Sequence, residues 1–256
     1  MTDADDRPAG VSTTRTSFAI LELLRDRGAL SLAEIRDETE LAKSTAYRHL
    51  TTLSSMGYLV EGDGRYRLSL KFLQLSQPPR TRKEGFGVAK QKVVELAQTT
   101  GERALFLVPE RFEGVYVHRA GGREPLQSDT MIGTRRPLHL LATGKAILAE
   151  WPDERVEAYI QTTGLDGYTE NSITDPDALR EELQTARDQG YATNIGEHMD
   201  GLRATGVPVY DQHDELLGGL SVFGPAGRVG EEELQSTYPT LLEDAAQELR
   251  IDLAYD

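Results

Sequence analysis

The amino-acid sequence predicts an α+β protein with two domains, a small N-terminal one followed by a larger one. Before Gly57 the apolar residues recur at helical spacing, and after it they alternate as in a β-hairpin. Pro78 and Pro79, followed by a basic run, interrupt both patterns. The rest of the chain mixes helices with consecutive hairpins, which favours an antiparallel sheet over a doubly wound parallel one. With 256 residues, each domain can bury a core.

Charge is distributed unevenly along the chain. The net charge is −14, from 42 acidic and 28 basic residues. Residues 1–77 contain 11 acidic and 10 basic residues, a net of −1, which leaves −13 for residues 78–256. No acidic residue lies between Leu41 and Val60, so a polyanion could approach there. The acidic composition, with more Arg than Lys, indicates a salt-adapted organism.

Composition also excludes several classes of protein. The chain has no cysteine, which excludes disulfides, thiolate catalysis and Cys-ligated metal. It has no run of about eighteen apolar residues, and its first residues are polar and acidic. We therefore expect neither a membrane partner nor a secretion signal, and we expect a cytoplasmic protein.

Helical patterns open the N-terminal domain. We assign residues 1–11 to a disordered tail and expect a helix over about Thr14–Arg27 that ends at Gly28. Its apolar positions recur at helical spacing; they are Phe18, Ile20, Leu21 and Leu24. Ser31 and Glu34 have the spacing of a capping box, which opens a second helix.

A third helix and a hairpin complete this domain. The third helix is expected over Ala42–Gly57, with Ala46, Leu50 and Leu53 facing inward. Strand patterns then flank a glycine-containing turn at Glu61–Gly64. Three helices followed by a hairpin predict a winged helix-turn-helix domain over residues 12–75.

The outward face of the third helix is the predicted DNA-reading surface. The first turns of a recognition helix enter the major groove. Arg48 could contact a guanine edge or a phosphate, and Lys43 a phosphate. The full predicted set, including two arginines on the wing, is Lys43, Ser44, Thr45, Tyr47, Arg48, Thr51, Arg65 and Arg67. His49 is interpreted as structural. A winged helix can also serve only as a protein-interaction module, and Tyr47 could be a packed surface aromatic.

The C-terminal part is expected to begin with a linker and a linker helix over residues 76–100. We assign residues 101–256 to the second domain. Strands are expected over 104–109, 115–120, 190–194, 205–210 and 216–223. Helices are expected over 84–100, 139–150, 154–162, 176–189 with Thr174 as its cap, and 231–254.

With these segments assembled, nearly the whole chain resembles the IclR family of transcriptional regulators. In the N-terminal part the resemblance rests mainly on Lys43–Leu50 and Gly57–Leu59. In the C-terminal part it rests mainly on Thr143–Ala149, Pro208–Asp211 and Leu220–Pro225. Each motif alone is weak, but two sets in the right order and spacing are specific.

The resemblance implies a GAF-like effector-binding domain and a homodimer or homotetramer on a palindromic operator in double-stranded DNA. It also implies a pocket for a small organic acid or aromatic effector. By motif alignment the pocket involves Gly133, Thr134, Leu138, Asn194, Ala204, Ser221 and Phe223. Family members often have Asp, Cys and Ser where this chain has Asn194, Ala204 and Phe223. A pocket with fewer polar groups should prefer a less polar ligand.

An enzymatic second domain finds little support in the motifs. Gly144-Lys145 resembles a phosphate-binding loop, but His139 stands where that motif needs Gly, and Ala146 where it needs Ser or Thr. Glu197 and His198 lack a second histidine at metal-ligand spacing. We therefore expect no enzyme activity, no cofactor and no metal. A C-terminal enzyme or pure oligomerisation module remains the alternative.

Overall fold

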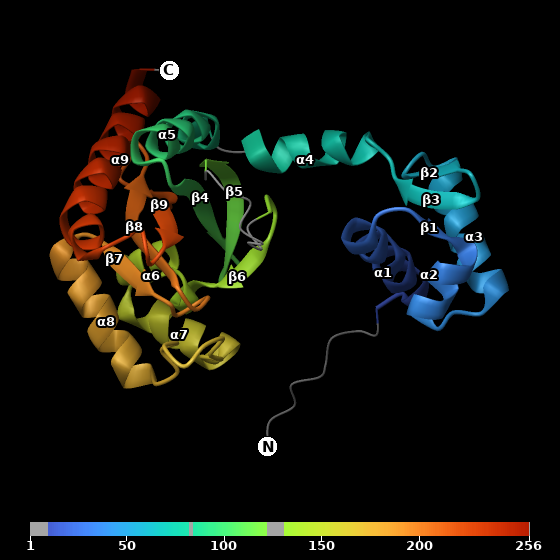
Figure 1. The fold of residues 1–256 in the computed structure, drawn as a ribbon, viewed down its shortest axis with the longest axis horizontal. Coiled ribbons are helices and arrows are strands. Elements are labelled where there is room, and N and C mark those ends of the chain that lie inside the picture. Colours follow the sequence, from blue (N-terminus) through green and yellow to red (C-terminus); the bar gives the residue numbers. More distant parts are fainter. Residues whose placement is uncertain (1–9, 82–83, 122–130, 256) are drawn as a thin grey trace. The chain divides into compact units, whose positions relative to one another are not determined.

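The computed structural model describes residues 10–81, 84–121 and 131–255 and divides into two compact units between Pro79 and Arg80. Most of the predicted tail over residues 1–11 lies outside the described residues. The first unit is the predicted winged helix-turn-helix (Figure 1). Its elements are α1 (Ser12–Arg27), β1 (Leu30–Ser31), α2 (Leu32–Thr39), α3 (Lys43–Ser55), β2 (Leu59–Gly62) and β3 (Arg65–Leu68).

Local signals determine most of the first unit. The capping box is present, because Ser31 Oγ accepts from the Glu34 N–H while the Glu34 carboxylate accepts from the Ser31 N–H. The β2–β3 turn places Asp63 and Gly64 at φ 51° and 69°, as a two-residue hairpin requires. The sheet order is β1-β3-β2, all antiparallel.

One residue of the predicted α1 stripe lies outside the core. Ile20, Leu21 and Leu24 are buried, but Phe18 is 60% exposed. At about 100° per residue, Phe18 lies more than a quarter turn from the centre of that stripe. The spacing of apolar residues in the sequence therefore predicted a wider buried face than α1 has.

Helix α4 (Lys71–Thr81) was not expected from the sequence. The sequence predicts a domain boundary at Pro78 and Pro79, and the two units do divide directly after Pro79, but both prolines lie inside this helix. Proline lacks the amide hydrogen for a helical hydrogen bond, but its fixed φ is compatible with helical backbone.

The second unit is built on a six-stranded antiparallel sheet with the order β6-β5-β4-β9-β8-β7. An antiparallel sheet was predicted, but its short strand β6 was not. The strands are β4 (Arg103–Glu110), β5 (Glu113–Gly121), β6 (Arg135–Pro137), β7 (Ala192–Ile195), β8 (Leu202–Tyr210) and β9 (Leu216–Pro225).

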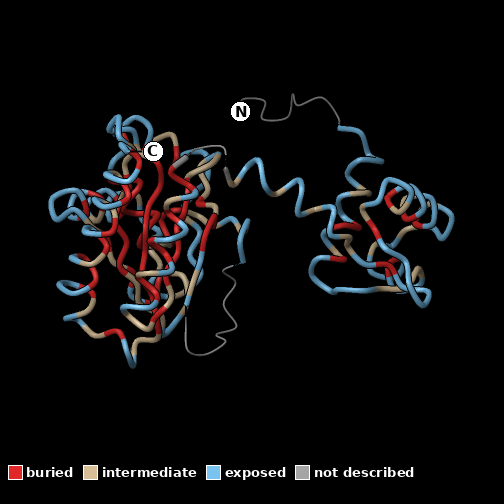
Figure 2. The backbone as a smooth tube through the Cα atoms, turned by 90° about the horizontal axis from the view of Figure 1, so that it is seen from above, coloured by how far each residue is buried: buried red, intermediate tan, exposed pale blue. Residues whose placement is uncertain are grey.

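Helices cover both faces of this sheet, and the strands between them are mostly buried (Figure 2). One face packs against α5 (Glu84–Thr100) and α9 (Tyr238–Tyr255), and the other against α6 (Ala142–Ala149), α7 (Asp153–Thr163) and α8 (Pro176–Gln189). The predicted linker helix, α5, is thus part of the core of the second unit. None of the described helices is long and apolar enough to cross a bilayer.

Two helix starts in the second unit differ from the prediction. The helix expected over residues 139–150 is interrupted: a 3-10 turn η1 (Leu138–Leu140) and the extended residue Leu141 precede α6. Helix α8 is capped by Asp175 instead of Thr174, since Asp175 Oδ1 accepts from the N–H groups of Asp177 and Ala178 at 3.0 and 2.9 Å. The last helix begins with a π-helical turn, η2 (Glu233–Thr237).

Candidate functional site

Helix α3 presents a polar face to solvent. Ala46 and Leu50 are fully buried and Leu53 nearly so, and these three side chains fix the inward side of the helix. On the opposite side the predicted residues are exposed, apart from the half-buried Thr45; the exposed ones are Lys43, Ser44, Tyr47, Arg48 and Thr51.

Arg48 also lines a polar hollow that α1 and α3 form together. The other lining residues, mostly hydroxyl-bearing, are Thr13, Thr14, Ser17, Thr45, His49 and Thr52. His49 Nδ1 lies 2.8 Å from Ser17 Oγ, so this histidine joins the two helices, as its structural interpretation requires. Thr13 and Thr14 are not in the predicted DNA-reading set, because only folding brings the start of α1 beside α3.

The two predicted wing arginines differ in their contacts. Arg65 donates to the Ala29 carbonyl at 2.9 Å and to the Glu34 carboxylate at 3.0 Å. The pKa of Glu34 is lowered to about 2, chiefly by the Ser31 N–H and hydroxyl and then by Arg65. Arg67 is exposed on the same strand. The charge of Arg65 is therefore shared with an acidic neighbour.

A cavity opens on the α6–α8 side of the large sheet. It contains about 530 Å³ of empty space, including its opening to solvent. Apolar side chains dominate its lining, and the described lining residues are Leu105, Tyr116, Leu141, Ala142, Thr143, Asn194, His198, Met199, Leu202, Ala204, Ser221 and Phe223.

Four of the seven predicted effector residues meet at this cavity: Asn194, Ala204, Ser221 and Phe223. The other three lie elsewhere. Leu138 is fully buried in the core beneath α6 and α7. Gly133 and Thr134 run along β5, where the Gly133 N–H donates to the Tyr116 carbonyl at 2.8 Å and the Tyr116 N–H donates to the Thr134 carbonyl at 3.1 Å.

Two glycines let the start of α6 form one wall of the cavity. A Cβ on Gly206 would lie 2.4 Å from the Thr143 nitrogen, and one on Gly219 would lie 2.5 Å from Thr143 Cγ2. Helix α6 therefore approaches strands β8 and β9 more closely than larger side chains would permit.

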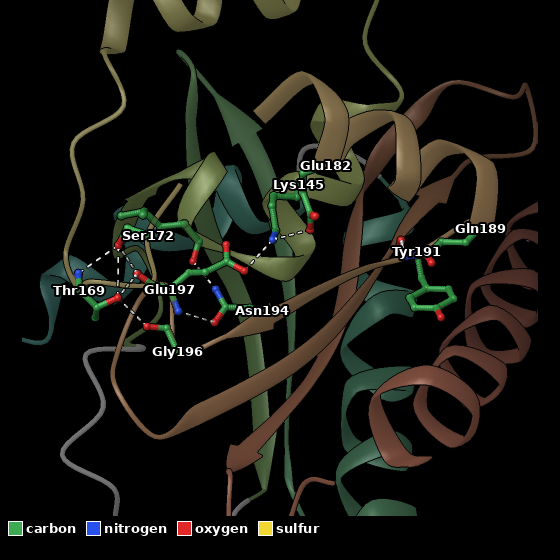
Figure 3. A network of polar contacts seen from close by, with 10 residues as sticks. Lys145, Thr169, Ser172, Glu182, Gln189, Tyr191, Asn194, Gly196 and Glu197 are labelled. Carbon is green, nitrogen blue, oxygen red and sulfur yellow. Dashed lines mark hydrogen bonds and ion pairs between the residues drawn. The ribbon is translucent and has the colours of Figure 1, made fainter. Parts of the chain in front are cut away.

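The side-chain amide of Asn194 joins two segments at the cavity. Its Nδ2 donates to the Leu140 carbonyl at 2.6 Å, and its Oδ1 accepts from the Glu197 N–H at 3.2 Å (Figure 3). Both ends of the amide are thus engaged within the protein. Asn194 thus lines the cavity and also braces η1 against the loop after β7.

A buried ion pair continues this network. Lys145, only 1% exposed, lies 2.7 Å from Glu197 Oε1 and 2.8 Å from Glu182 Oε1 (Figure 3). Burial raises the pKa of Glu197, and the Lys145 ammonium opposes this shift. Lys145 therefore links α6 both to α8 and to the loop after β7.

The predicted pocket set omits two polar cavity residues, Tyr116 and His198. Tyr116 lies far along the chain from the motifs that predicted the pocket. His198 lies between Asn194 and Ala204, but with Glu197 it was considered only as part of a metal site. Burial raises the pKa of the Tyr116 phenol to about 12. Burial and then the charge of Arg136 lower the pKa of His198. No group of three His, Cys, Asp or Glu among the described residues could hold a metal.

Comparison with known proteins covers both units. The model of the IclR helix-turn-helix domain matches residues 15–63, and that of the bacterial transcriptional regulator IclR C-terminal domain matches residues 82–250. The chain is 32% identical to the HTH-type transcriptional regulator KdgR of Escherichia coli, over 99% of this chain and 97% of that protein. It is 29% identical to the probable regulator ArcR of Halobacterium salinarum, over 96% of each. The crystal structure of the Thermotoga maritima IclR matches with a TM-score of 0.83 at 29% identity, over 94% of this chain and 98% of that one.

Proposed function

Because the chain belongs to the IclR family of transcriptional regulators, we propose that α3 reads operator DNA and that the cavity of the second unit binds the effector. The protein is a DNA-binding transcriptional regulator with a C-terminal effector-binding domain. Its relatives are named transcriptional regulators, so the alternative of an enzyme or a pure oligomerisation module is not favoured.

The exposed face of α3 is the observation that carries the DNA-reading assignment. Its N-terminal turns project polar and basic side chains from a stretch without any acidic residue. In this fold those turns enter the major groove. Arg48 then contacts a guanine edge or a phosphate, Lys43 contacts the backbone, and the neighbouring hydroxyls take base or phosphate contacts.

The lining of the cavity supports a small organic acid or aromatic compound as effector. Most of the wall is apolar, which suits a ring or a branched carbon chain. Helix α6 begins at this wall without a side-chain cap, so its first N–H groups are available to an oxygen of the ligand.

The operator and the assembly follow from how paired recognition helices bind. A homodimer or homotetramer would place two copies of α3 on a palindromic operator. Effector binding would shift the population between arrangements and so change operator affinity, at a catabolic operon in the cytoplasm. The proposal of salt adaptation rests on the net charge of −14 and the excess of Arg over Lys.

A gel-shift assay tests the DNA assignment. Full-length protein is titrated onto the promoter fragment beside its own gene, as wild type and as Arg48→Ala. We expect the variant to lose at least about tenfold in affinity. Arg111→Ala, which removes an exposed arginine from the second unit, is the matched control and should bind like wild type. Wild-type affinity in Arg48→Ala would refute the assignment of α3.

A further inference from the structure

The loop after β7 forms one wall of the cavity and is held firmly in place. Thr169 Oγ1 donates to the Gly196 carbonyl at 2.7 Å, and Ser172 Oγ donates to the Glu197 carbonyl at 2.6 Å (Figure 3). The Glu197 side chain is bound to Lys145, and its N–H to Asn194. The next residue, His198, therefore reaches the cavity from a fixed backbone.

The residues that the family pattern places around the ligand offer few free polar groups in this cavity. The Asn194 amide is engaged at both ends by the Leu140 carbonyl and the Glu197 N–H. Ala204 and Phe223, which the family pattern places around the ligand, are apolar. Of the four expected contact residues at the cavity, only Ser221 still offers an uncommitted polar type. Polar recognition must draw on other residues.

His198 has the group best suited to that recognition. Its Nδ1 is buried, and no described residue forms a hydrogen bond with it. Its ring lies against that of Tyr168, with centroids 5.5 Å apart, which limits its rotation. Buried polar atoms in folded proteins nearly always have a partner. His198 lines the cavity, so a ligand that displaces the atoms covering Nδ1 would supply this partner.

The protonation state of His198 indicates what that partner is. Burial, together with the nearby positive charge of Arg136, keeps the pKa of the imidazole low, so the ring is neutral near pH 7. A neutral imidazole nitrogen donates to or accepts from an uncharged oxygen according to its tautomer. Apolar side chains, among them Leu105, Leu202 and Phe223, surround the remaining space.

We propose that His198 forms the specificity-determining hydrogen bond to the effector, and that it binds a hydroxyl or carbonyl oxygen of a small organic acid or aromatic compound. This rests on the proposed role of the cavity as the effector site. The polar contact to the effector is then made by His198, on the loop that Asn194 helps to hold in place, instead of by Asn194.

Calorimetric titration of the full-length protein tests the proposal. The probes are benzoate and its three monohydroxy isomers, so that only the position of one hydroxyl differs. We expect the best hydroxy isomer to bind wild type about tenfold more tightly than benzoate, the equivalent of one good hydrogen bond. In His198→Leu this preference should fall to within about twofold, while His198→Gln, whose amide still forms hydrogen bonds, should keep part of it.

Controls separate the possible outcomes. His213→Gln, at an exposed histidine in the turn between β8 and β9, should keep the full preference. The gel shift of each variant without probe shows that it is folded and binds DNA. If wild type does not bind DNA, the proposed function is refuted. If DNA binding is intact, three results would refute only this inference: wild type binds no probe, wild type binds all probes equally, or His198→Leu keeps the preference.

Discussion

Lys145 Nζ lies 2.7 Å from Glu197 Oε1, and both side chains are buried between α6 and the loop that carries His198. Removing one partner of a buried pair leaves an uncompensated charge, which costs about 3–5 kcal/mol. We therefore expect Lys145→Met to lower the free energy of unfolding by about that amount. Urea unfolding followed by the fluorescence of Trp151, the single tryptophan, measures it.

Two further variants check that the charge is the cause. Lys90→Met removes an exposed lysine on α5 and should leave stability nearly unchanged. The double variant Lys145→Met/Glu197→Gln removes both charges and should recover part of the loss. If Lys145→Met unfolds at the same urea concentration as Lys90→Met, the pair does not stabilise the cavity wall.

Gly206 is expected to accept no side chain. A Cβ there would lie 2.4 Å from the backbone nitrogen of Thr143, which cannot move without shifting α6. Gly206→Ala should cost roughly 1–3 kcal/mol through overpacking. Gly227→Ala is the control, because a Cβ there meets nothing within 4 Å. Equal melting temperatures for the two variants would show that α6 does not approach the sheet as described.

His139 should make stability depend on pH. The side chain is 1% exposed and lies 2.7 Å from the Tyr159 hydroxyl, and burial lowers its pKa below 6.5. Below pH 6.5 the unfolded chain therefore binds a proton that the folded imidazole resists. Stability then falls as the pH drops through this window. His139→Gln should flatten this slope, measured as the urea midpoint between about pH 7.5 and about pH 5.5.

Two other histidines contribute to the pH dependence of stability that remains in His139→Gln. His118 and His198 also have lowered pKa values because of burial, so they contribute in the same direction. If His139→Gln loses as much stability on acidification as wild type, proton uptake at His139 makes no contribution.

Arg65 and Arg67 should differ in their effect on DNA binding. Arg65 is bound to Glu34 and to the Ala29 carbonyl, whereas Arg67 is exposed. Arg67→Ala should make the slope of log affinity against log salt concentration shallower, by about the amount expected for the loss of one phosphate contact. Arg65→Ala should change that slope less. Fluorescence anisotropy on one duplex at several salt concentrations measures both, and a larger change for Arg65→Ala would reverse the assignment.

Local chemistry explains why the first unit was predictable. The capping box at Ser31 and Glu34 and the turn at Asp63 and Gly64 each act over a few residues, so the sequence displays them directly. The IclR-type fold of the second unit was also predicted, through motifs along nearly its whole length. Helix α4 was missed because Pro78 and Pro79, which mark the boundary between the two units, were not expected inside a helix.

The site was less predictable because its contacts join distant segments. Asn194 reaches a carbonyl 54 residues away, and Arg65 reaches a carboxylate 31 residues away. Neither partner can be inferred from residue type or spacing. His198 likewise enters the cavity only because the loop that carries it is bound to Thr169 and Ser172.

Selection of bound sequences from a randomised duplex library tests most directly whether α3 reads bases. Wild type is compared with Tyr47→Ala and Thr51→Ala, which alter exposed side chains of α3 without changing charge. We expect at least one variant to select different bases at defined positions of the operator. Unchanged base preferences in both variants, with only uniformly weaker binding, would contradict this prediction.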